Sequence, residues 1–200
     1  MRLSSNERTL LVGATGTGKT YLAQRLVASA PRLVVIDPKS TLRGQWGLSE
    51  YERVRRKVTR GEPVRARFAP EPGGEAGYER VLEDVYHAGN TLVYIDEVYG
   101  VVPPGRPAGP YFTALYTRGR EMGIGVIAAT QRPAWVPLFI ASEAQNFIMF
   151  ALLFARDKKR MAEFMGDAVL ADIPDPHGFF FYQTRWRGVG GGARYYRSVR

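Results

Sequence analysis

The stretch at residues 13–20, GATGTGKT, has the residue types and the spacing needed to hold a chain of phosphates. It fits the pattern G-x-x-x-x-G-K-[ST] at every fixed position, with Gly13, Gly18, Lys19 and Thr20. In this pattern small residues let the backbone curl its N–H groups toward phosphate oxygens, the lysine reaches the β- and γ-phosphates, and the hydroxyl binds Mg²⁺. The predicted nucleotide contacts are Gly13, Ala14, Thr15, Gly16, Thr17, Gly18, Lys19, Thr20 and Tyr21.

The segments on either side of this loop supply the expected context. Residues 9–13 form a short apolar run typical of a strand, and residues 19–29 have helical spacing, with Leu22, Leu26 and Ala30 on one side. The N-terminus of that helix would then face the phosphates, where its backbone N–H groups and dipole favour anions. The sequence therefore predicts a nucleoside triphosphate site with bound Mg²⁺.

Two carboxylates follow another apolar run, at residues 91–96. Asp96 is placed to hold Mg²⁺ beside Thr20, and Glu97 to polarise the attacking water. A second carboxylate next to the magnesium-binding aspartate favours hydrolysis by water over transfer to a small acceptor. A solvated acidic pair is the commoner meaning of such a strand end, and only the upstream loop makes the catalytic interpretation the stronger one.

Two further polar positions follow predicted strands and have more than one interpretation. Gln131 ends the run 124–130, where its amide could contact the γ-phosphate or the water, or form a turn before Arg132-Pro133. Asp37-Pro38-Lys39 closes the run 33–37, and Lys39 could touch phosphate or nucleic acid, or lie in a surface turn.

Composition predicts one domain over residues 1–200 with a substantial core, since 45% of the 200 residues are hydrophobic. The formal net charge of +9 suits a partner with a phosphate backbone. Disulfides and thiolate metal sites are excluded because the chain has no cysteine. No secretory signal fits the N-terminus, and the longest apolar run, at 147–155, is too short for a membrane span and predicts a buried strand.

Apolar runs alternate with helical stretches along the chain. We expect strands at 9–13, 33–37, 91–96, 124–130 and 146–153, and helices at 19–29, 76–88, 109–121 and 157–165. This alternation predicts an α/β fold with a mostly parallel central sheet and helices on both faces. The C-terminal segment 183–200 is basic and aromatic, with five Arg and no acid. It could bind DNA, capsid or membrane, or form an edge strand pairing with 178–183; the edge strand is the preferred interpretation of its core, and the role of its arginines stays open.

Taken together, these motifs resemble the FtsK–HerA family of DNA-pumping ATPases over most of the chain. The resemblance is carried by LLVGATGTGKT, by IDPK at 36–39, by YIDE at 94–97 and by RGREMGIGVIAATQRP at 118–133. It implies a P-loop NTPase fold of the RecA-like ASCE type, ATP as the nucleotide, and a ring of subunits, a hexamer or a pentamer, with ATP sites between them. It also implies that Gln131 is a polar sensor and that an arginine acts in trans, Arg120 first and Arg118 second, although both also suit an exposed helix face.

The family members that segregate chromosomes carry membrane spans and a winged-helix domain, and HerA-type helicases usually carry an N-terminal β-barrel. An ATPase domain of about this size without these additional domains resembles the genome-packaging ATPases of tailless double-stranded DNA viruses with an internal membrane. The expected partners are double-stranded DNA and capsid-vertex or membrane proteins of the virion, with action in the host cytoplasm and at the virion vertex. The alternatives are a plasmid-transfer or chromosome-segregation pump, and a nucleotide-binding phage assembly or export protein.

Such a translocating ATPase should contact the phosphates of DNA, because it has to act on duplex DNA of any base sequence. The expected contacts are Arg106 in the Pro/Gly loop 101–110, and Lys39, Arg43 and Trp46 in the segment 39–47. The basic cluster at residues 53–60 is better interpreted as a solvated helix face.

Overall fold

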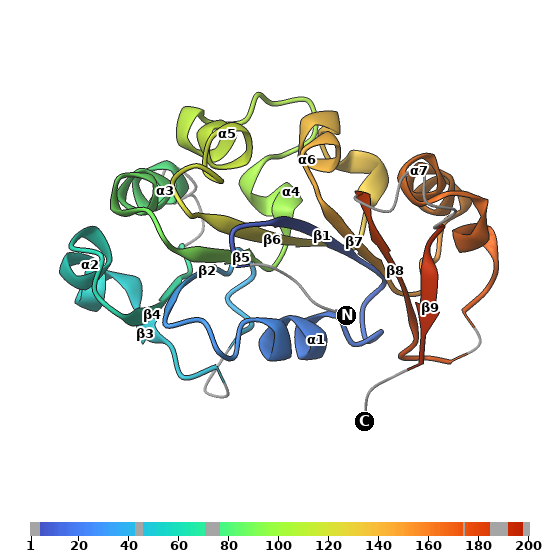
Figure 1. The fold of residues 1–200 in the computed structure, drawn as a ribbon, viewed down its shortest axis with the longest axis horizontal. Helices are drawn as coiled ribbons and strands as arrows, with labels where there is room; N and C mark the ends of the chain where they lie inside the picture. The colour runs from blue at the N-terminus through green and yellow to red at the C-terminus, as the bar shows by residue number, and fades with distance from the viewer. Residues whose placement is uncertain (1–4, 43–45, 71–76, 174, 185–191, 198–200) are drawn as a thin grey trace.

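The structure, a computed structural model, describes residues 5–42, 46–70, 77–173, 175–184 and 192–197. Over these ranges the strands form one nine-stranded sheet in the order β3-β4-β2-β5-β6-β1-β7-β8-β9 (Figure 1). Their bounds are β1 Arg8–Val12, β2 Arg32–Ile36, β3 Ser49–Glu50, β4 Val64–Phe68, β5 Leu92–Ile95, β6 Gly125–Thr130, β7 Asn146–Met149, β8 Phe179–Gln183 and β9 Arg194–Tyr196.

Neighbouring strands from β3 to β7 pair in parallel, and β8 and β9 join the far edge in antiparallel fashion. The predicted mostly parallel sheet is therefore confirmed. The edge-strand interpretation of the C-terminal segment also holds where the segment is described, because β9 pairs Tyr195 with Phe180 of β8.

The described helices are α1 Lys19–Leu26, α2 Tyr51–Thr59, α3 Gly77–Ala88, α4 Val98–Val101, α5 Pro110–Thr117, α6 Leu138–Ser142 and α7 Ala155–Met165, with short 3₁₀ turns at Pro133–Trp135 and Asp167–Leu170. They cover both faces of the sheet unequally. Figure 1 shows α1 on one side and α3, α5 and α6 on the other. Among the described residues, no helix combines the length and the hydropathy needed to cross a bilayer.

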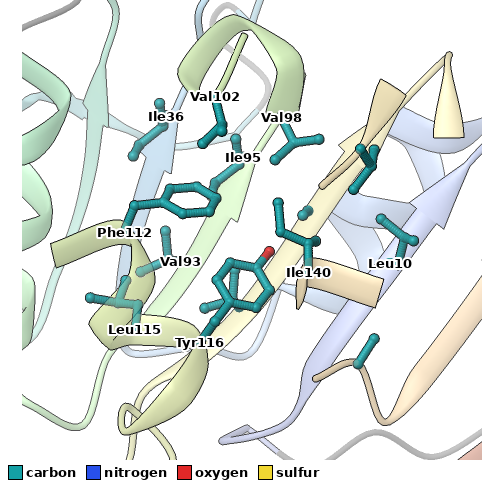
Figure 2. Close-up of a cluster of buried hydrophobic side chains, with 14 of the residues drawn as sticks. Leu10, Ile36, Val93, Ile95, Val98, Val102, Phe112, Leu115, Tyr116 and Ile140 are labelled. Carbon is teal, nitrogen blue, oxygen red and sulfur yellow. The ribbon is translucent and has the colours of Figure 1, made fainter. Parts of the chain in front are cut away.

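The larger core lies between the sheet and the helices opposite α1. Phe112 and Tyr116 of α5 stack with their ring centroids 5.2 Å apart and pack toward Val93 and Ile95 of β5 (Figure 2). The smaller core, on the other face, joins Ala23 and Val27 at α1 to β-strand side chains such as Leu11. Burial of apolar surface on both faces explains why β5 and most of β6 are apolar.

The carboxylate of Glu79 links two helices of the larger core. Its oxygens accept the backbone N–H groups of Tyr111 (2.8 Å) and Phe112 (3.2 Å) in the first turn of α5. Those N–H groups have no partner within their own helix, so a carboxylate from α3 satisfies them and complements the helix dipole. This contact fixes where α5 begins after the Pro/Gly loop.

Several predicted boundaries are wrong. The run 146–153 is a strand only to Met149, and Leu153 and Phe154 are 80% and 50% exposed rather than buried. Helix α5 ends at Thr117, so Arg118 is its C-cap and Arg120 lies in the turn that follows.

Sequence reasoning also missed β4, because Arg65 and Arg67 alternate with its apolar residues. Both arginines are nevertheless held inside the fold. Arg65 donates to backbone carbonyls that include those of Val27 and Ala30, and Arg67 pairs with Asp37. Charged residues that normally indicate an exposed segment are here compensated by long-range hydrogen bonds.

Candidate nucleotide and catalytic site

The predicted phosphate loop follows the carboxyl end of β1 and leads into α1, as its sequence requires. Gly16 and Gly18 have φ angles of 79° and 102°, in the left-handed region that favours glycine. A Cβ on Gly13 would lie 2.6 Å from the Cβ of Phe150, so this position must also be glycine. Among the described residues, the backbone N–H groups of Gly16 and Gly18 donate to no backbone carbonyl, which leaves them available to an anion.

Lys19 lies over its own loop. Its side chain is 9% exposed, and its Nζ donates to the carbonyl oxygen of Ala14 at 2.7 Å. Burial lowers the pKa of Lys19, while the nearby carboxylates of Glu97 and Asp96 act in the opposite direction. This position of Lys19 suits phosphate binding. A bound phosphate would replace the carbonyl oxygen of Ala14 as the partner of the Lys19 ammonium group, and a charged acceptor forms the stronger hydrogen bond.

Asp96 and Thr20 meet at the hydroxyl of Tyr94. That hydroxyl donates to Asp96 Oδ1 at 2.7 Å and is hydrogen-bonded to Thr20. Burial raises the pKa of Asp96, and the hydrogen bond from Tyr94 opposes the rise. Tyr94 is itself buried and stacks on Trp46, with centroids 5.2 Å apart. Sequence reasoning gave Tyr94 no role.

This arrangement fits Mg²⁺. The ion usually binds to proteins through one or two side-chain oxygens together with substrate phosphates and water. Asp96 and Thr20 present one carboxylate and one hydroxyl beside the phosphate loop. Within the described part of the chain, no group of three or more His, Cys, Asp or Glu side chains is arranged to hold a metal ion. Thr20 and Asp96 are the residues that would hold Mg²⁺, together with oxygens of bound phosphates.

Glu97 is the most enclosed carboxylate of the site, at 1% exposed. Burial raises its pKa, and hydrogen bonds from Thr130, Lys39 and the Gln131 backbone oppose the rise. Lys39 Nζ lies 3.1 Å from Glu97 Oε2, and the Gln131 backbone N–H lies 3.4 Å from Glu97 Oε1. A buried carboxylate whose proton affinity is raised in this way suits a group that polarises water.

The side chain of Gln131 also reaches the phosphate loop, since its Oε1 accepts the hydroxyl of Thr15 at 2.9 Å. The next residue, Arg132, fixes this turn. Its guanidinium donates to buried Asp157 at 2.9 Å and lies 4.3 Å from the ring centroids of both Trp135 and Phe154. The structure therefore brings Gln131 into the site, and it adds an anchor that no local sequence signal indicated.

Arg118 and Arg120 are not part of this site within one chain. Arg120 is exposed, and its charge acts on Arg8 at the beginning of β1, whereas the phosphate loop follows the end of β1. A strand of that length separates its two ends by about 13 Å. Arg118 contacts the ring of Tyr86, 5.8 Å from its centroid. Action of Arg120 on a neighbouring subunit stays a prediction.

The remaining predicted residues fall in different places. Tyr21 is 54% exposed and receives a hydrogen bond from Arg25, so its nucleotide contact stays a prediction. Arg106 is exposed in the loop after α4, and Arg43 lies outside the described residues. Trp46 is 6% exposed against Tyr94, so its expected role as a DNA contact is wrong.

Known proteins resemble this chain in sequence and in fold. No family model matches the sequence. The chain is 29% identical over 175 residues to the DNA packaging ATPase P9 of Enterobacteria phage PRD1, covering 81% of this chain and 71% of that protein. It is 27% identical over 164 residues to Protein P9 of Pseudoalteromonas phage PM2, covering 79% of this chain and 74% of that protein.

The chain is therefore similar in sequence to the phage P9 proteins. Its fold matches that of the genome packaging NTPase B204 from Sulfolobus turreted icosahedral virus 2, solved in complex with ATP-gammaS. The TM-score is 0.79 at 17% identity, over 99% of this chain and 100% of that one. The predicted resemblance to viral genome-packaging ATPases is thus confirmed by the similarity to P9, and the predicted P-loop NTPase fold is confirmed by the match to B204.

Proposed function

We propose that this protein hydrolyses ATP to drive double-stranded DNA into a viral capsid. The observation that carries the proposal is the convergence of Lys19, Asp96, Glu97 and Gln131 around one phosphate loop, in a chain similar in sequence to a DNA packaging ATPase. The basic balance of the chain supports a polyanionic partner, with a formal net charge of +9.

Each residue of the site has a defined part in hydrolysis. The loop backbone and Lys19 bind the β- and γ-phosphates, and Thr20 and Asp96 hold Mg²⁺, which would neutralise charge on those phosphates. Glu97 accepts a hydrogen bond from the attacking water. Gln131, at the loop through Thr15, orients the water or the γ-phosphate. Burial keeps competing water away from Glu97.

The proposal includes a ring of subunits, because Arg120 lies far from its own phosphate loop. An arginine in trans would stabilise charge on the transferring phosphoryl group, an effect of about 10³–10⁵ in rate in related systems. Each subunit would then supply the phosphate loop of one site and Arg120 of the next. We place the working ring in the host cytoplasm during assembly and at the virion vertex, with capsid or membrane proteins as partners.

The test of the catalytic assignment is the variant Glu97→Gln. It should bind a fluorescent ATP analogue as wild type does and hydrolyse ATP at least ~10²-fold more slowly, since it loses a positioned base. Glu62→Gln, on the surface turn after α2, is the matched control and should hydrolyse normally. Normal turnover in Glu97→Gln would contradict the role given to Glu97.

The test of the DNA partner is the effect of duplex DNA on hydrolysis. Turnover should rise with added duplex, and binding should weaken steeply with salt because phosphate contacts release counterions. A rate that does not respond to duplex DNA at low salt would remove DNA from the proposal while leaving the ATPase site intact.

A further inference from the structure

A tyrosine in the apolar strand β5 carries its hydroxyl to the two residues that would hold Mg²⁺. Tyr94 is fully buried in the smaller core, where its partners in register on the adjacent strands are Val35 and Ile127. Its hydroxyl donates to Asp96 Oδ1 at 2.7 Å and is hydrogen-bonded to Thr20. An apolar side chain would fill this position without needing any polar partner, so packing alone does not explain the hydroxyl.

The number of protons fixes the direction of these hydrogen bonds. A tyrosine hydroxyl has one proton, and a carboxylate is an acceptor only. Because the proton of Tyr94 goes to Asp96, the bond between Tyr94 and Thr20 uses the proton of the Thr20 hydroxyl. The three side chains therefore form one directed chain, in which Thr20 donates to Tyr94 and Tyr94 donates to Asp96.

This directed chain leaves oxygen lone pairs free for a cation. The Thr20 hydroxyl spends its proton on Tyr94 and keeps its own lone pairs, and Asp96 keeps its second carboxylate oxygen, Oδ2. Thr20 is exposed and Asp96 is half-buried, whereas Tyr94 is fully buried. An ion that arrives with a nucleotide can therefore reach Thr20 and Asp96 without displacing Tyr94.

A second aromatic side chain holds the tyrosine ring in place. Trp46 stacks on Tyr94 with ring centroids 5.2 Å apart and an interplanar angle of 21°, and Trp46 is itself 6% exposed. Close packing around a buried ring restricts its orientation, which fixes the Tyr94 hydroxyl relative to Asp96 and Thr20. Mutation of a partner that orients metal ligands in this way typically costs about 10–100-fold in metal affinity.

We propose that Tyr94 is a positioning residue for Mg²⁺, which orients the Thr20 hydroxyl and the Asp96 carboxylate toward the ion that accompanies ATP. The choice of Mg²⁺ and ATP rests on the proposed function. Tyr94 contacts neither the ion nor the nucleotide in this role. It raises the affinity of the site for Mg²⁺ through the two residues that it bonds.

The test measures how Tyr94→Phe binds a fluorescent, non-hydrolysable ATP analogue, first in EDTA and then in a titration with Mg²⁺. The variant keeps the ring and its stack on Trp46 and removes only the hydroxyl. Affinity in EDTA should match wild type, because the phosphate loop and Lys19 are unchanged. The Mg²⁺ concentration at half-saturation should rise about 10–100-fold. Tyr51→Phe is the matched control, since it removes another buried hydroxyl that donates to a carboxylate, Asp84, and both values should stay at wild type.

Two further measurements separate the hydroxyl from the ring and from the chemistry of hydrolysis. Trp46→Leu removes the stack and keeps the hydroxyl, so it should raise the half-saturating Mg²⁺ concentration less than Tyr94→Phe does. In ATPase assays, high Mg²⁺ should restore most of the turnover of Tyr94→Phe, because the defect lies in the affinity for the ion. The same addition should not restore Glu97→Gln.

Three results would overturn the proposal. A wild-type response to Mg²⁺ in Tyr94→Phe would show that the hydroxyl does not act on the ion. Equal losses of nucleotide affinity with and without Mg²⁺ would make Tyr94 a structural support of the loop. A larger effect of Trp46→Leu than of Tyr94→Phe would assign the effect to ring packing.

The binding measurements do not depend on hydrolysis, so they separate this proposal from the proposed function. A wild-type protein that binds the nucleotide with Mg²⁺ but does not hydrolyse ATP would overturn the proposed function. The positioning role would still stand in that case if Tyr94→Phe selectively weakened the binding of Mg²⁺.

Discussion

The buried carboxylate of Asp157 should stabilise both the fold and the turn that carries Gln131. Asp157 is 1% exposed at the side chain and accepts the Arg132 guanidinium at 2.9 Å and the Ala134 backbone N–H at 3.0 Å. The variant Asp157→Asn keeps the shape but converts one acceptor oxygen into an NH₂ donor. Either Arg132 or Ala134 would then face a donor instead of an acceptor.

The expected loss follows from the burial of the pair. Removing one charge from a buried ion pair costs about 3–5 kcal/mol. Arg132 keeps 26% exposure and its two ring contacts, so water can replace part of the lost bond. We therefore expect a loss of about 2 kcal/mol, which lowers Tm by about 4–8 °C for a domain of this size. Turnover should also fall, with nucleotide affinity retained, because the sensor turn loses its anchor.

Urea unfolding and ATPase assays on Asp157→Asn and Asp172→Asn provide the check. Asp172 also pairs with a cation of α7, Lys158, but its side chain is 94% exposed. Exposed pairs contribute little to stability, so Asp172→Asn should be indistinguishable from wild type. Equal effects of the two substitutions, or wild-type stability and turnover in Asp157→Asn, would refute the assignment of Asp157 as the anchor.

Three further predictions follow from the charged residues. Mixing Arg120→Ala with Lys19→Ala protein should restore some hydrolysis at mixed interfaces, and no recovery at any ratio would count against Arg120 in trans. Burial acts to raise the pKa of Asp84, but hydrogen bonds led by Arg55 lower it overall. The resulting stabilisation is present above the unfolded pKa of about 3.9 and is lost as pH falls through the lower folded-state pKa, so Asp84→Asn should lower Tm at pH 7, and its difference from wild type should shrink as the solution is made more acidic. Arg106→Ala should weaken duplex binding and reduce its salt slope by about 1, whereas an unchanged slope would exclude a phosphate contact.

The parts of the site that sequence predicted are those fixed by local pattern. The phosphate loop combines contiguous residues with a strand before it and a helix after it, and Asp96 and Glu97 follow an apolar strand. Since parallel strands place their carboxyl ends at one edge of a sheet, these segments had to meet. Gln131 follows the same rule at the end of β6.

The parts that sequence missed depend on contacts between distant residues. The Lys39–Glu97 pair joins two turns 58 positions apart, and the Arg132–Asp157 pair joins the sensor turn to a helix. No local pattern encodes either contact. The extent of β7 is a similar case. Its apolar sequence continues past Met149, but the chain there turns to bond the phosphate loop, with Ala151 accepting the N–H of Ala14 at 2.8 Å.

The central claim is that hydrolysis at this loop moves duplex DNA, and displacement of a third strand from a triplex tests it most directly. The protein should release the third strand from a duplex track in the presence of ATP and Mg²⁺. Release should stop with a non-hydrolysable analogue, with chelation of Mg²⁺, or with Glu97→Gln. Hydrolysis by wild type at the DNA-stimulated rate with no release of the third strand would contradict the account.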